Sequence, residues 1–571
     1  MTTHRLLVAL EEGADLTALT PAEQALVEAG RAELSFDVAA ARRLLSSADV
    51  PRELEPMKRL LTLRVRLRDA PDGALDDALD ELRALSRGDD PALGARAHHL
   101  EGVVHLRRGR IEEAERAFVT ALGASADPAF RSHVLDGFGQ ALLGAGAWNE
   151  ARRVLTAVAR DKERRGDRVG TAITVGHLAL LELRLGRPVE AAAVANRWLQ
   201  TAGPSPVLTR LRLATLALGA EADAGLPLSR LSEVESLVFA AGETHHPLIG
   251  FAAVALARTT GAAREWLEVA REHLVAPSDV ALLRYWEAVL GVAPEPDDAY
   301  LERMQQLFRA SPLPSEAEIL TRLFLAARAR AGDPLAARRH LDAAYACAAR
   351  ANNPLWQDRV DRASRTLDPE GLSARLVERF SGRSLDELSQ TVHEEVTVVF
   401  ADLVGFTPRT LELAPEDVMA TVRGLFELAV PLMTRHRVRP LSYLGDGLLA
   451  VAEGEGHERR GLCFAQDLVA RAARVSIARR ALGEKWGLDL RAGVATGKVV
   501  LGTLGTLFKL EFAAIGPATN LASRLQGAAA EGEVLAATLP GEHTDFSACP
   551  VTLPLKGWRD EVRAIRYTQR G

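Results

Sequence analysis

The first two thirds of the chain repeat one short spacing, in which a Gly is followed five residues later by an Ala. The four clear copies run from Gly to Ala at Gly109–Ala114, Gly146–Ala151, Gly186–Ala191 and Gly332–Ala337. A further apolar residue follows each Ala at an interval of four: Phe118, Leu155, Ala195 or Leu341. The first three copies lie 37 and 40 residues apart, which is typical of helix-hairpin repeats. We expect each Gly to end one helix and each small Ala to let the next helix pack closely against it.

Helices repeated in this way form a solenoid, which offers a concave groove for binding or assembly. The units loosely resemble tetratricopeptide repeats, although the Trp and Tyr positions of that pattern are mostly unfilled. The alternative is a set of unrelated amphipathic helices in an Ala-rich chain. The Gly-to-Ala spacing is not clear between about residues 203 and 310, so the repeat boundaries there stay open. No catalytic constellation stands out in this part. Adjacent histidines such as His98 and His99, or His245 and His246, point to different helix faces, so we expect surface or helix-end residues there.

The composition excludes several other classes of protein. The net charge is −6 with acids and bases mixed throughout, so a basic surface for nucleic acid is not expected. The three cysteines are too few and too scattered for a disulfide framework or a metal site. No apolar run approaches about 18 residues, and the first ten residues hold too short an apolar core for a signal peptide. We therefore expect a cytoplasmic protein without a membrane partner.

The most informative residues of the last third are two carboxylates that follow apolar runs. Asp402 closes the β-branched run 396–400, which predicts a buried strand. Asp446 lies in a Gly-Asp-Gly turn between the runs 440–444 and 448–451, which predicts a β-hairpin. Each Asp alone is more often a solvated turn residue. Together, at neighbouring strand ends, they provide the ligands that a pair of divalent ions needs for phosphoryl chemistry.

From about residue 394 the sequence alternates strands and helices, and six motifs carry a family resemblance. They are 396–407 (VTVVFADLVGFT), 443–450 (YLGDGLLA), 490–502 (LRAGVATGKVVLG), 510–516 (LEFAAIG), 520–525 (NLASRL) and 555–557 (LKG). In this order and spacing, the segment resembles the catalytic domain of class III nucleotidyl cyclases, the adenylyl and guanylyl cyclases. The resemblance implies a multidomain chain in which helical repeats precede an α+β, ferredoxin-like cyclase domain. It also implies turnover of a nucleoside triphosphate.

The chemistry requires the ribose 3′-hydroxyl to attack the α-phosphate while pyrophosphate leaves in line. Two Mg²⁺ or Mn²⁺ ions on Asp402 and Asp446 would lower the hydroxyl pKa and neutralise the triphosphate. The resemblance adds the Leu403 carbonyl as a metal ligand. A predicted helix start offers backbone N–H groups for phosphate oxygens at Val404, Gly405, Phe406 and Thr407.

Asn520 and Arg524 are four residues apart on a predicted helix and therefore share one face. An Asn can orient the ribose, and an Arg can stabilise charge at the α-phosphate. We expect Lys556 to contact the terminal phosphates. The resemblance also implies a head-to-tail homodimer, in which one protomer supplies the two Asp residues and its partner supplies the Asn and Arg.

Two positions depart from the adenylyl cyclase pattern. Ser442 stands where those enzymes have a purine-reading Lys, and Ala513 stands where they have its Asp or Thr partner. A guanine-reading Glu is missing as well. The base specificity is therefore open, with ATP as the first choice on the frequency of that activity in the family.

We divide the chain into a helical-repeat domain at 1–365, a connector helix at 366–393 and a cyclase domain at 394–571. The repeats are expected to bind a protein partner and to regulate turnover through the connector. The alternative is a catalytically degenerate cyclase fold that binds nucleotide as a switch on a repeat scaffold.

Overall fold

The computed structural model describes the chain except for residues 1–5, 7–18, 35–36, 70–74, 202, 204, 242–245, 276, 293–303, 305–315, 331, 351–353, 370, 373–391, 507–508, 538–542, 544 and 571. The backbone divides into two compact units. The first holds 1–144, 151–321 and 353–356, and the second holds 145–150, 322–352 and 357–571. Most of the expected connector helix lies outside the described residues. Within the described part of the chain, no helix is both long and apolar enough to span a membrane.

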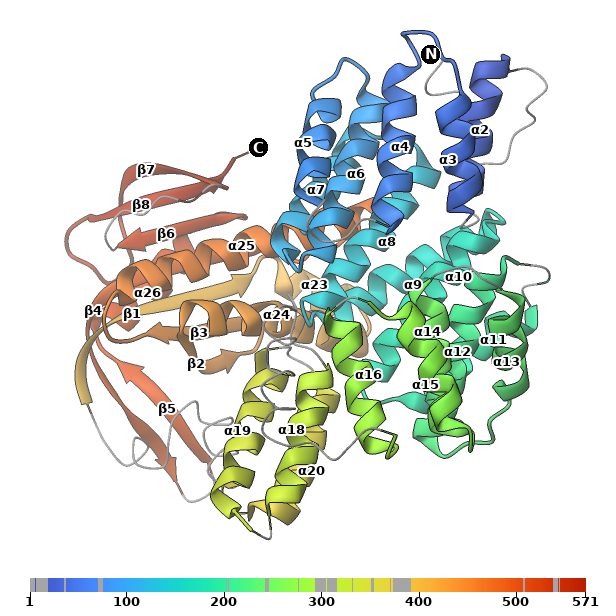
Figure 1. The fold of residues 1–571 in the computed structure, drawn as a ribbon. Helices are drawn as coiled ribbons and strands as arrows, with labels where there is room; N and C mark the ends of the chain where they lie inside the picture. The colour runs from blue at the N-terminus through green and yellow to red at the C-terminus, as the bar shows by residue number, and fades with distance from the viewer. Residues whose placement is uncertain are drawn as a thin grey trace. The chain divides into compact units, whose positions relative to one another are not determined.

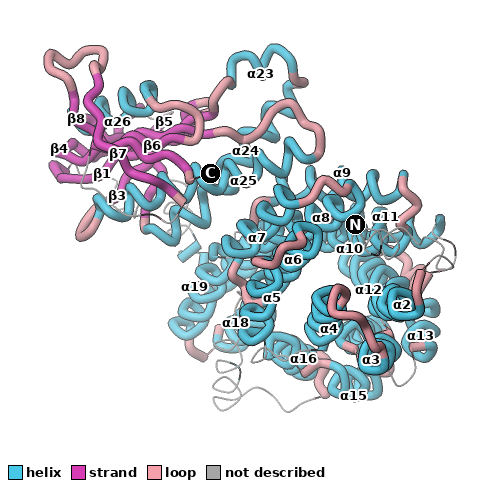
Figure 2. The backbone as a smooth tube through the Cα atoms, turned by 90° about the horizontal axis from the view of Figure 1, so that it is seen from above, coloured by secondary structure: helices cyan, strands magenta, loops and turns pink. Residues whose placement is uncertain are grey.

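The first unit consists of helices, as the sequence predicts (Figure 1). They are α2 (Pro21–Leu34), α3 (Val38–Ser47), α4 (Glu55–Asp69), α5 (Leu75–Ser86), α6 (Pro91–Arg107), α7 (Ile111–Ala124), α8 (Pro128–Gly144), α9 (Trp148–Arg164), α10 (Arg168–Arg184), α11 (Pro188–Thr201), α12 (Val207–Ala224), α13 (Leu231–Ala240), α14 (Pro247–Thr259), α15 (Ala263–His273) and α16 (Pro277–Val289). Figure 2 shows them following one another around an arc, with α6, α8, α10 and α12 toward its inner side.

Three of the four Gly-to-Ala copies mark helical-hairpin turns with a left-handed Gly, as expected, whereas Gly332 of the fourth copy has no left-handed φ. Gly109, Gly146 and Gly186 have φ of 68°, 73° and 74°, the left-handed conformation that a Gly adopts without steric strain. The Ala five residues after each of them is at most 1% exposed. The apolar residues four positions further on, Phe118, Leu155 and Ala195, are fully buried. The spacing therefore encodes a helix end followed by a close helix–helix contact. The segment 203–310, where the spacing is not clear, also contains helices, α12 to α16, in its described residues.

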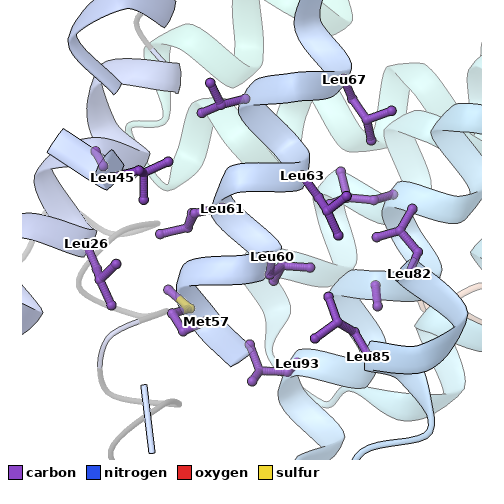
Figure 3. Close-up of a cluster of buried hydrophobic side chains, with 14 of the residues drawn as sticks. Leu26, Leu45, Met57, Leu60, Leu61, Leu63, Leu67, Leu82, Leu85 and Leu93 are labelled. Carbon is purple, nitrogen blue, oxygen red and sulfur yellow. The ribbon is translucent and has the colours of Figure 1, made fainter. Parts of the chain in front are cut away.

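Leucines dominate the core between the first helices of this unit. Leu26 of α2, Leu45 of α3, Leu63 of α4 and Leu82 of α5 belong to one buried cluster, which continues to Leu93 of α6 (Figure 3). Helices such as α4, whose Leu60, Leu61 and Leu63 all belong to this cluster, are buried on more than one side, so a single hairpin cannot bury its own apolar surface. Stacking neighbouring hairpins buries a continuous core, which is the physical basis of repeat architectures.

The second unit combines helices with one mixed sheet, which confirms the expected α+β class (Figure 1). Its helices are α19 (Pro334–Arg350), most of α18 (Glu316–Ala329) and of α20 (Pro354–Leu367), and α23 (Phe406–Glu412), α24 (Pro415–His436), α25 (His457–Ala481) and α26 (Pro517–Ala528). Its strands are β1 (Val392–Leu403), β2 (Val438–Leu444), β3 (Gly447–Ala452), β4 (Leu490–Thr506), β5 (Lys509–Ile515), β6 (Glu533–Ala537), β7 (Phe546–Leu553) and β8 (Val562–Gln569).

The strand order is β2-β3-β1-β4-β6-β8-β7, and β5 pairs with β4. The first four strands, with α24 and α25 between them, follow the β-α-β-β-α-β order of ferredoxin-like folds. β1 lies between β3 and β4 and is antiparallel to both. The apolar run 396–400 is thus a central strand, as its β-branched composition predicts.

Alternate residues of β1 face different helices, and this alternation directs the end of the strand. Val396 and Val398 pack in one cluster with Ala522 and Leu525 of α26. On the other face, the side chains of Thr397 and Val399 occupy the space where a Cβ at Gly461 of α25 would lie. Because side chains alternate along a strand, Asp402 shares the α26 face with Val396 and Val398.

Candidate active site

The fold brings the two predicted carboxylates together at one end of the sheet. Asp402, at the end of β1, pairs in register with Gly447, the first residue of β3. Leu444 also pairs with Gly447, so Gly445 and Asp446 form the two-residue turn of the β2–β3 hairpin. Gly445 has φ of 66°, which a Gly accepts readily at this position. The turn thus ends directly beside Asp402, as the sequence predicts.

Asp446 lies close enough to Asp402 for the two carboxyl groups to affect each other's charge. Burial, followed by the charge of Asp402, raises the pKa of Asp446 to about 6. Two carboxylates this close repel each other when both are ionised, so Asp446 holds its proton up to about pH 6. A divalent cation between them would replace that proton and remove the repulsion, so this pair fits a metal site.

Two further side chains contact Asp402, and the sequence reasoning missed both. Gln526 of α26 donates from Nε2 to Asp402 Oδ2 at 3.1 Å. Arg491, the register partner of Asp402 on β4, donates to the same oxygen at 3.5 Å. The Arg491 guanidinium also lowers the pKa of Asp446, opposing the larger effects of burial and of Asp402. The signal for Arg491 was its place in the motif 490–502, directly after the first residue of a predicted strand.

The segment after β1 begins the short helix α23, and Gly405 precedes it with φ of 69°. The backbone N–H of Val404 donates to the Asp489 carbonyl at 2.9 Å. We therefore correct the set of expected phosphate-binding amides, because the Val404 amide is already used inside the fold. Gly405 and Thr407 are exposed and Phe406 is half-buried. The Leu403 side chain is buried, and its N–H faces the Asp446 carbonyl at 3.4 Å.

The predicted pair on α26 lies on a different side of that helix from Gln526. Asn520 and Arg524 are both exposed, and neither side chain has a hydrogen bond or ion pair within the described part of the chain. Successive helix residues are rotated by about 100°, so Arg524 points about 200° away from Gln526. Because Gln526 contacts Asp402, the Asn520–Arg524 face is directed away from the carboxylates of its own chain.

The expected base-reading positions lie on two strands. Ser442 is half-buried on β2 opposite Leu449, just after a β-bulge. Ala513 is half-buried on β5 opposite Gly502. Lys556 is exposed in the turn before β8. No contact that the structure describes joins Ser442, Ala513 or Lys556 to the two carboxylates.

Comparisons with known proteins agree with this geometry. Residues 388–539 match the family model described as the Adenylate and Guanylate cyclase catalytic domain. An "Adenylate cyclase" of Mycobacterium tuberculosis is 28% identical over 181 residues, covering 31% of this chain and 38% of that protein. "Adenylate cyclase 1" of Rhizobium meliloti is 31% identical over 139 residues, covering 24% of this chain and 21% of that protein. "Receptor-type guanylate cyclase gcy-6" of Caenorhabditis elegans is 29% identical over 186 residues, covering 31% of this chain and 16% of that protein.

Among solved structures, the guanylyl cyclase Cya2 matches at 22% identity with a TM-score of 0.29, covering 32% of this chain and 94% of that one. The chain spans well under half the length of the curated relatives named above. The second unit itself contains an α+β domain with two adjacent acidic residues at one sheet end. Residues 388–539 match the class III adenylate and guanylate cyclase catalytic domain.

Proposed function

We propose that the chain is a nucleotidyl cyclase, which converts a nucleoside triphosphate into a 3′,5′-cyclic nucleotide and pyrophosphate. The observation that carries this proposal is that Asp402 lies directly beside the Gly445–Asp446 turn, in a segment that matches the cyclase catalytic domain. Two carboxylates beside each other in a partly exposed site suit divalent ions, whereas a purely structural role would not need them to be adjacent.

Asp402, Asp446 and the Leu403 carbonyl are the ligands that we assign to two Mg²⁺ or Mn²⁺ ions. When bound, the ions would lower the pKa of the ribose hydroxyl and neutralise the triphosphate. Gln526 and Arg491 hold the Asp402 carboxylate from α26 and β4. A metal ligand whose orientation is fixed by neighbouring hydrogen bonds loses less freedom on binding.

Asn520 and Arg524 are the residues that we assign to the ribose and to the charge at the α-phosphate. Their exposed face is turned away from Asp402 of the same chain, so a second protomer is needed to supply them. This supports a homodimer in which each site combines the carboxylates of one protomer with the Asn and Arg of the other. The amides of Gly405, Phe406 and Thr407, with Lys556, remain our candidates for the phosphates.

Ser442 and Ala513 do not identify the base that the site prefers. Ser442 can make one hydrogen bond and Ala513 none, so neither provides strong discrimination between purines. We propose ATP as the substrate. The relatives named above include both adenylate and guanylate cyclases.

The helical repeats are the part that we propose to regulate turnover, with 1–365 as the repeat domain, 366–393 as the connector and 394–571 as the catalytic domain. We propose a protein partner for the repeats, which resemble tetratricopeptide units. Small misplacements of the half-sites are costly in catalysis, so a partner that shifts the connector would change the rate.

The experiment that tests the function uses the full chain with Mn²⁺ and each of the four nucleoside triphosphates, followed by chromatography of cyclic product and pyrophosphate. We expect equal amounts of cyclic nucleotide and pyrophosphate from at least one substrate. Asp402→Ala protein is the control for contaminating enzymes. If nucleotide binds to wild-type protein but no cyclic product forms, the alternative of a degenerate nucleotide-binding switch replaces the cyclase.

A further inference from the structure

The peptide between Leu403 and Val404 is held from one side by the segment that precedes β4. The Val404 N–H donates to the Asp489 carbonyl at 2.9 Å. This peptide is trans and planar, so its N–H and its C=O point in opposite directions. The Leu403 carbonyl therefore points away from Asp489, and its direction follows from the position of the Asp489 carbonyl.

Arg409 of α23 links the two segments that meet at this hydrogen bond. Its Nη2 donates to the Val404 carbonyl at 3.0 Å, and its Nη1 donates to the Gly487 carbonyl at 2.7 Å. The planar guanidinium offers these donors in a fixed arrangement, which a flexible ammonium group does not. Arg409 thus fixes Val404 relative to Gly487, which lies two residues before Asp489.

The turn before β4 is itself anchored to α25. The Leu488 N–H donates to Ser476 Oγ at 2.7 Å. The Arg480 guanidinium donates to the Asp489 carboxylate at 2.9 Å. Because both contacts hold this turn on a long helix, Arg409 ties the segment after β1 to a fixed support.

The burial of Arg409 is costly, and its ion pairing compensates for little of that cost. The residue is 3% exposed, and its Nε has no hydrogen-bond partner within the described residues. Its ion pair with Asp489 Oδ2 is long, at 3.9 Å. Burial lowers the pKa of Arg409, and the charge of Asp489 opposes this effect. Replacing a buried ion by an apolar residue is often neutral or stabilising, so the value of Arg409 lies in its two directed donors.

Other contacts between this turn and the segment around α23 lie near the surface. Lys485 pairs with Glu412 at 2.6 Å, but their side chains are 67% and 46% exposed, and such pairs contribute little. Trp486 lies beside Gly405, where an added Cβ would be 3.8 Å from the ring. The Arg409 guanidinium lies 5.2 Å from the same ring. Arg409 makes a buried connection, and a hydrogen bond is electrostatically stronger there than in water.

We propose that Arg409 is a positioning residue, which directs the Leu403 carbonyl toward the metal ions by holding Val404 on the turn before β4. This inference rests on the proposed function, because Leu403 is one of the metal ligands assigned there. Without Arg409 the peptide has more rotational freedom, so its carbonyl spends less time in the geometry that a metal ion needs. Removing a group that orients a metal ligand usually lowers metal affinity about 10–100-fold.

The test measures Mn²⁺ binding to full-length protein without nucleotide, by electron paramagnetic resonance of the free ion. Arg409→Met keeps an unbranched apolar side chain and removes both donors. We expect its Kd for Mn²⁺ to be at least tenfold above that of the wild type, at a temperature well below the Tm of each protein. Arg409→Lys keeps the charge and one donor group, so its Kd should lie between the two.

The choice of ion separates positioning from a general loss of stability. Mg²⁺ needs a nearly ideal octahedral set of ligands, whereas Ca²⁺ accepts variable geometry. Competition with Mn²⁺ gives the affinities for both ions. In Arg409→Met the affinity for Mg²⁺ should fall at least threefold more than the affinity for Ca²⁺. A destabilised fold would reduce both affinities by the same factor.

Two control variants should bind Mn²⁺ as the wild type does. Arg563→Met replaces an exposed arginine on β8. Lys485→Met removes the exposed ion pair of the turn and leaves the hydrogen bonds of Arg409 in place. Asp402→Ala protein gives the level of Mn²⁺ binding outside the site.

The outcomes distinguish this inference from the proposed function. Wild-type protein that binds Mn²⁺ no better than Asp402→Ala protein would remove the proposed metal site, and the role of Arg409 with it. Wild-type binding that Arg409→Met leaves unchanged would overturn the role of Arg409 alone. Equal losses of Mg²⁺ and Ca²⁺ affinity would mean that Arg409 only stabilises the fold. If Arg409→Met fails to fold, the same comparison in Arg409→Lys decides between these results.

Discussion

Gln526 donates a hydrogen bond from Nε2 to Oδ2 of Asp402 at 3.1 Å, joining α26 to the end of β1. The helix that carries Asn520 and Arg524 on its exposed face therefore also holds a proposed metal ligand on its buried side. In a homodimer, one α26 would serve two sites: its own through Gln526 and the partner's through Asn520 and Arg524. A shift of this helix would change both sites together.

Replacing either carboxylate should abolish turnover. Asp402→Ala and Asp446→Ala should each lower kcat by about 10³-fold or more, since the metal ions supply several kcal/mol of charge stabilisation and each 1.4 kcal/mol is worth tenfold. Circular dichroism should be unchanged, because both residues lie at strand ends and not in a packed core. Glu416→Ala, at an exposed position of α24, is the control. Activity near wild type in either mutant would show that the metal assignment is wrong.

Mixing two inactive proteins should restore part of the activity. In a dimer of Asp402→Ala with Arg524→Ala, one interface site carries both changes and the other is wholly wild type. Random exchange makes about half the dimers mixed, so recovery should be roughly a quarter of wild-type activity when distant sites act independently. Differential affinity tags confirm the exchange. A mixture that stays inactive although exchange is complete would rule out the shared site.

Loss of the Gln526 hydrogen bond should weaken metal binding without unfolding the domain. Gln526→Ala should raise the Mn²⁺ concentration needed for half-maximal activity about 10–100-fold, the usual effect of removing a hydrogen bond to a metal ligand. Saturating Mn²⁺ should recover most of kcat, which a general folding defect would not allow. Ser523→Ala, on the same helix, should behave as wild type. An unchanged Mn²⁺ requirement in Gln526→Ala would exclude the positioning role.

Metal binding should depend on pH through Asp446. Its pKa of about 6 means that a proton competes with the metal below that pH and is absent above it. From pH 6 to pH 5 the apparent Kd for Mn²⁺ should rise by about fivefold, because one proton must leave for the metal to bind. The thermal shift caused by Mn²⁺ at several pH values measures this. A Kd that is constant between pH 7 and pH 5 would contradict the raised pKa.

The same raised pKa predicts an effect on stability without metal. A carboxyl whose pKa is raised on folding stabilises the folded state below its ordinary value of 3.8, and that stability is lost as pH rises through about 6. Asp446→Asn should therefore raise the Tm of the metal-free protein at pH 7.5, and the gain should disappear below pH 4. Because the site is partly exposed, the gain should not exceed about 1 kcal/mol.

Base preference should respond to the two departures from the adenylyl cyclase pattern. Ser442→Lys combined with Ala513→Asp should shift the ratio of kcat/KM for ATP over GTP toward ATP by about ten- to a hundredfold, the usual value of one or two good polar contacts. Measuring kcat/KM for ATP and for GTP in the wild type and in the double variant tests whether these positions face the base. No change in the ratio would place base recognition elsewhere.

The sequence by itself determined the elements and the position of the two carboxylates. The Gly-to-Ala spacing predicts hairpin turns because only Gly accepts the left-handed conformation freely, and only a small residue fits the following contact. Asp402 at the end of a β-branched run and Asp446 in a two-residue turn are local features, and both hold in the structure. Local geometry depends on neighbours along the chain, so a sequence pattern can encode it.

Only the tertiary structure decided what surrounds those residues. Gln526 is 124 residues from Asp402 and Arg491 is 89 residues from it, and they meet it only through the packing of α26 and the register of β4. The sequence predicts a surface or helix-end position for His99, because the pattern of its own helix does not show which other helices pack against it. Its ring lies 5.7 Å from that of Phe118 and 5.8 Å from that of Phe130. Contacts between distant elements depend on register and on helix packing, which no short stretch of sequence specifies.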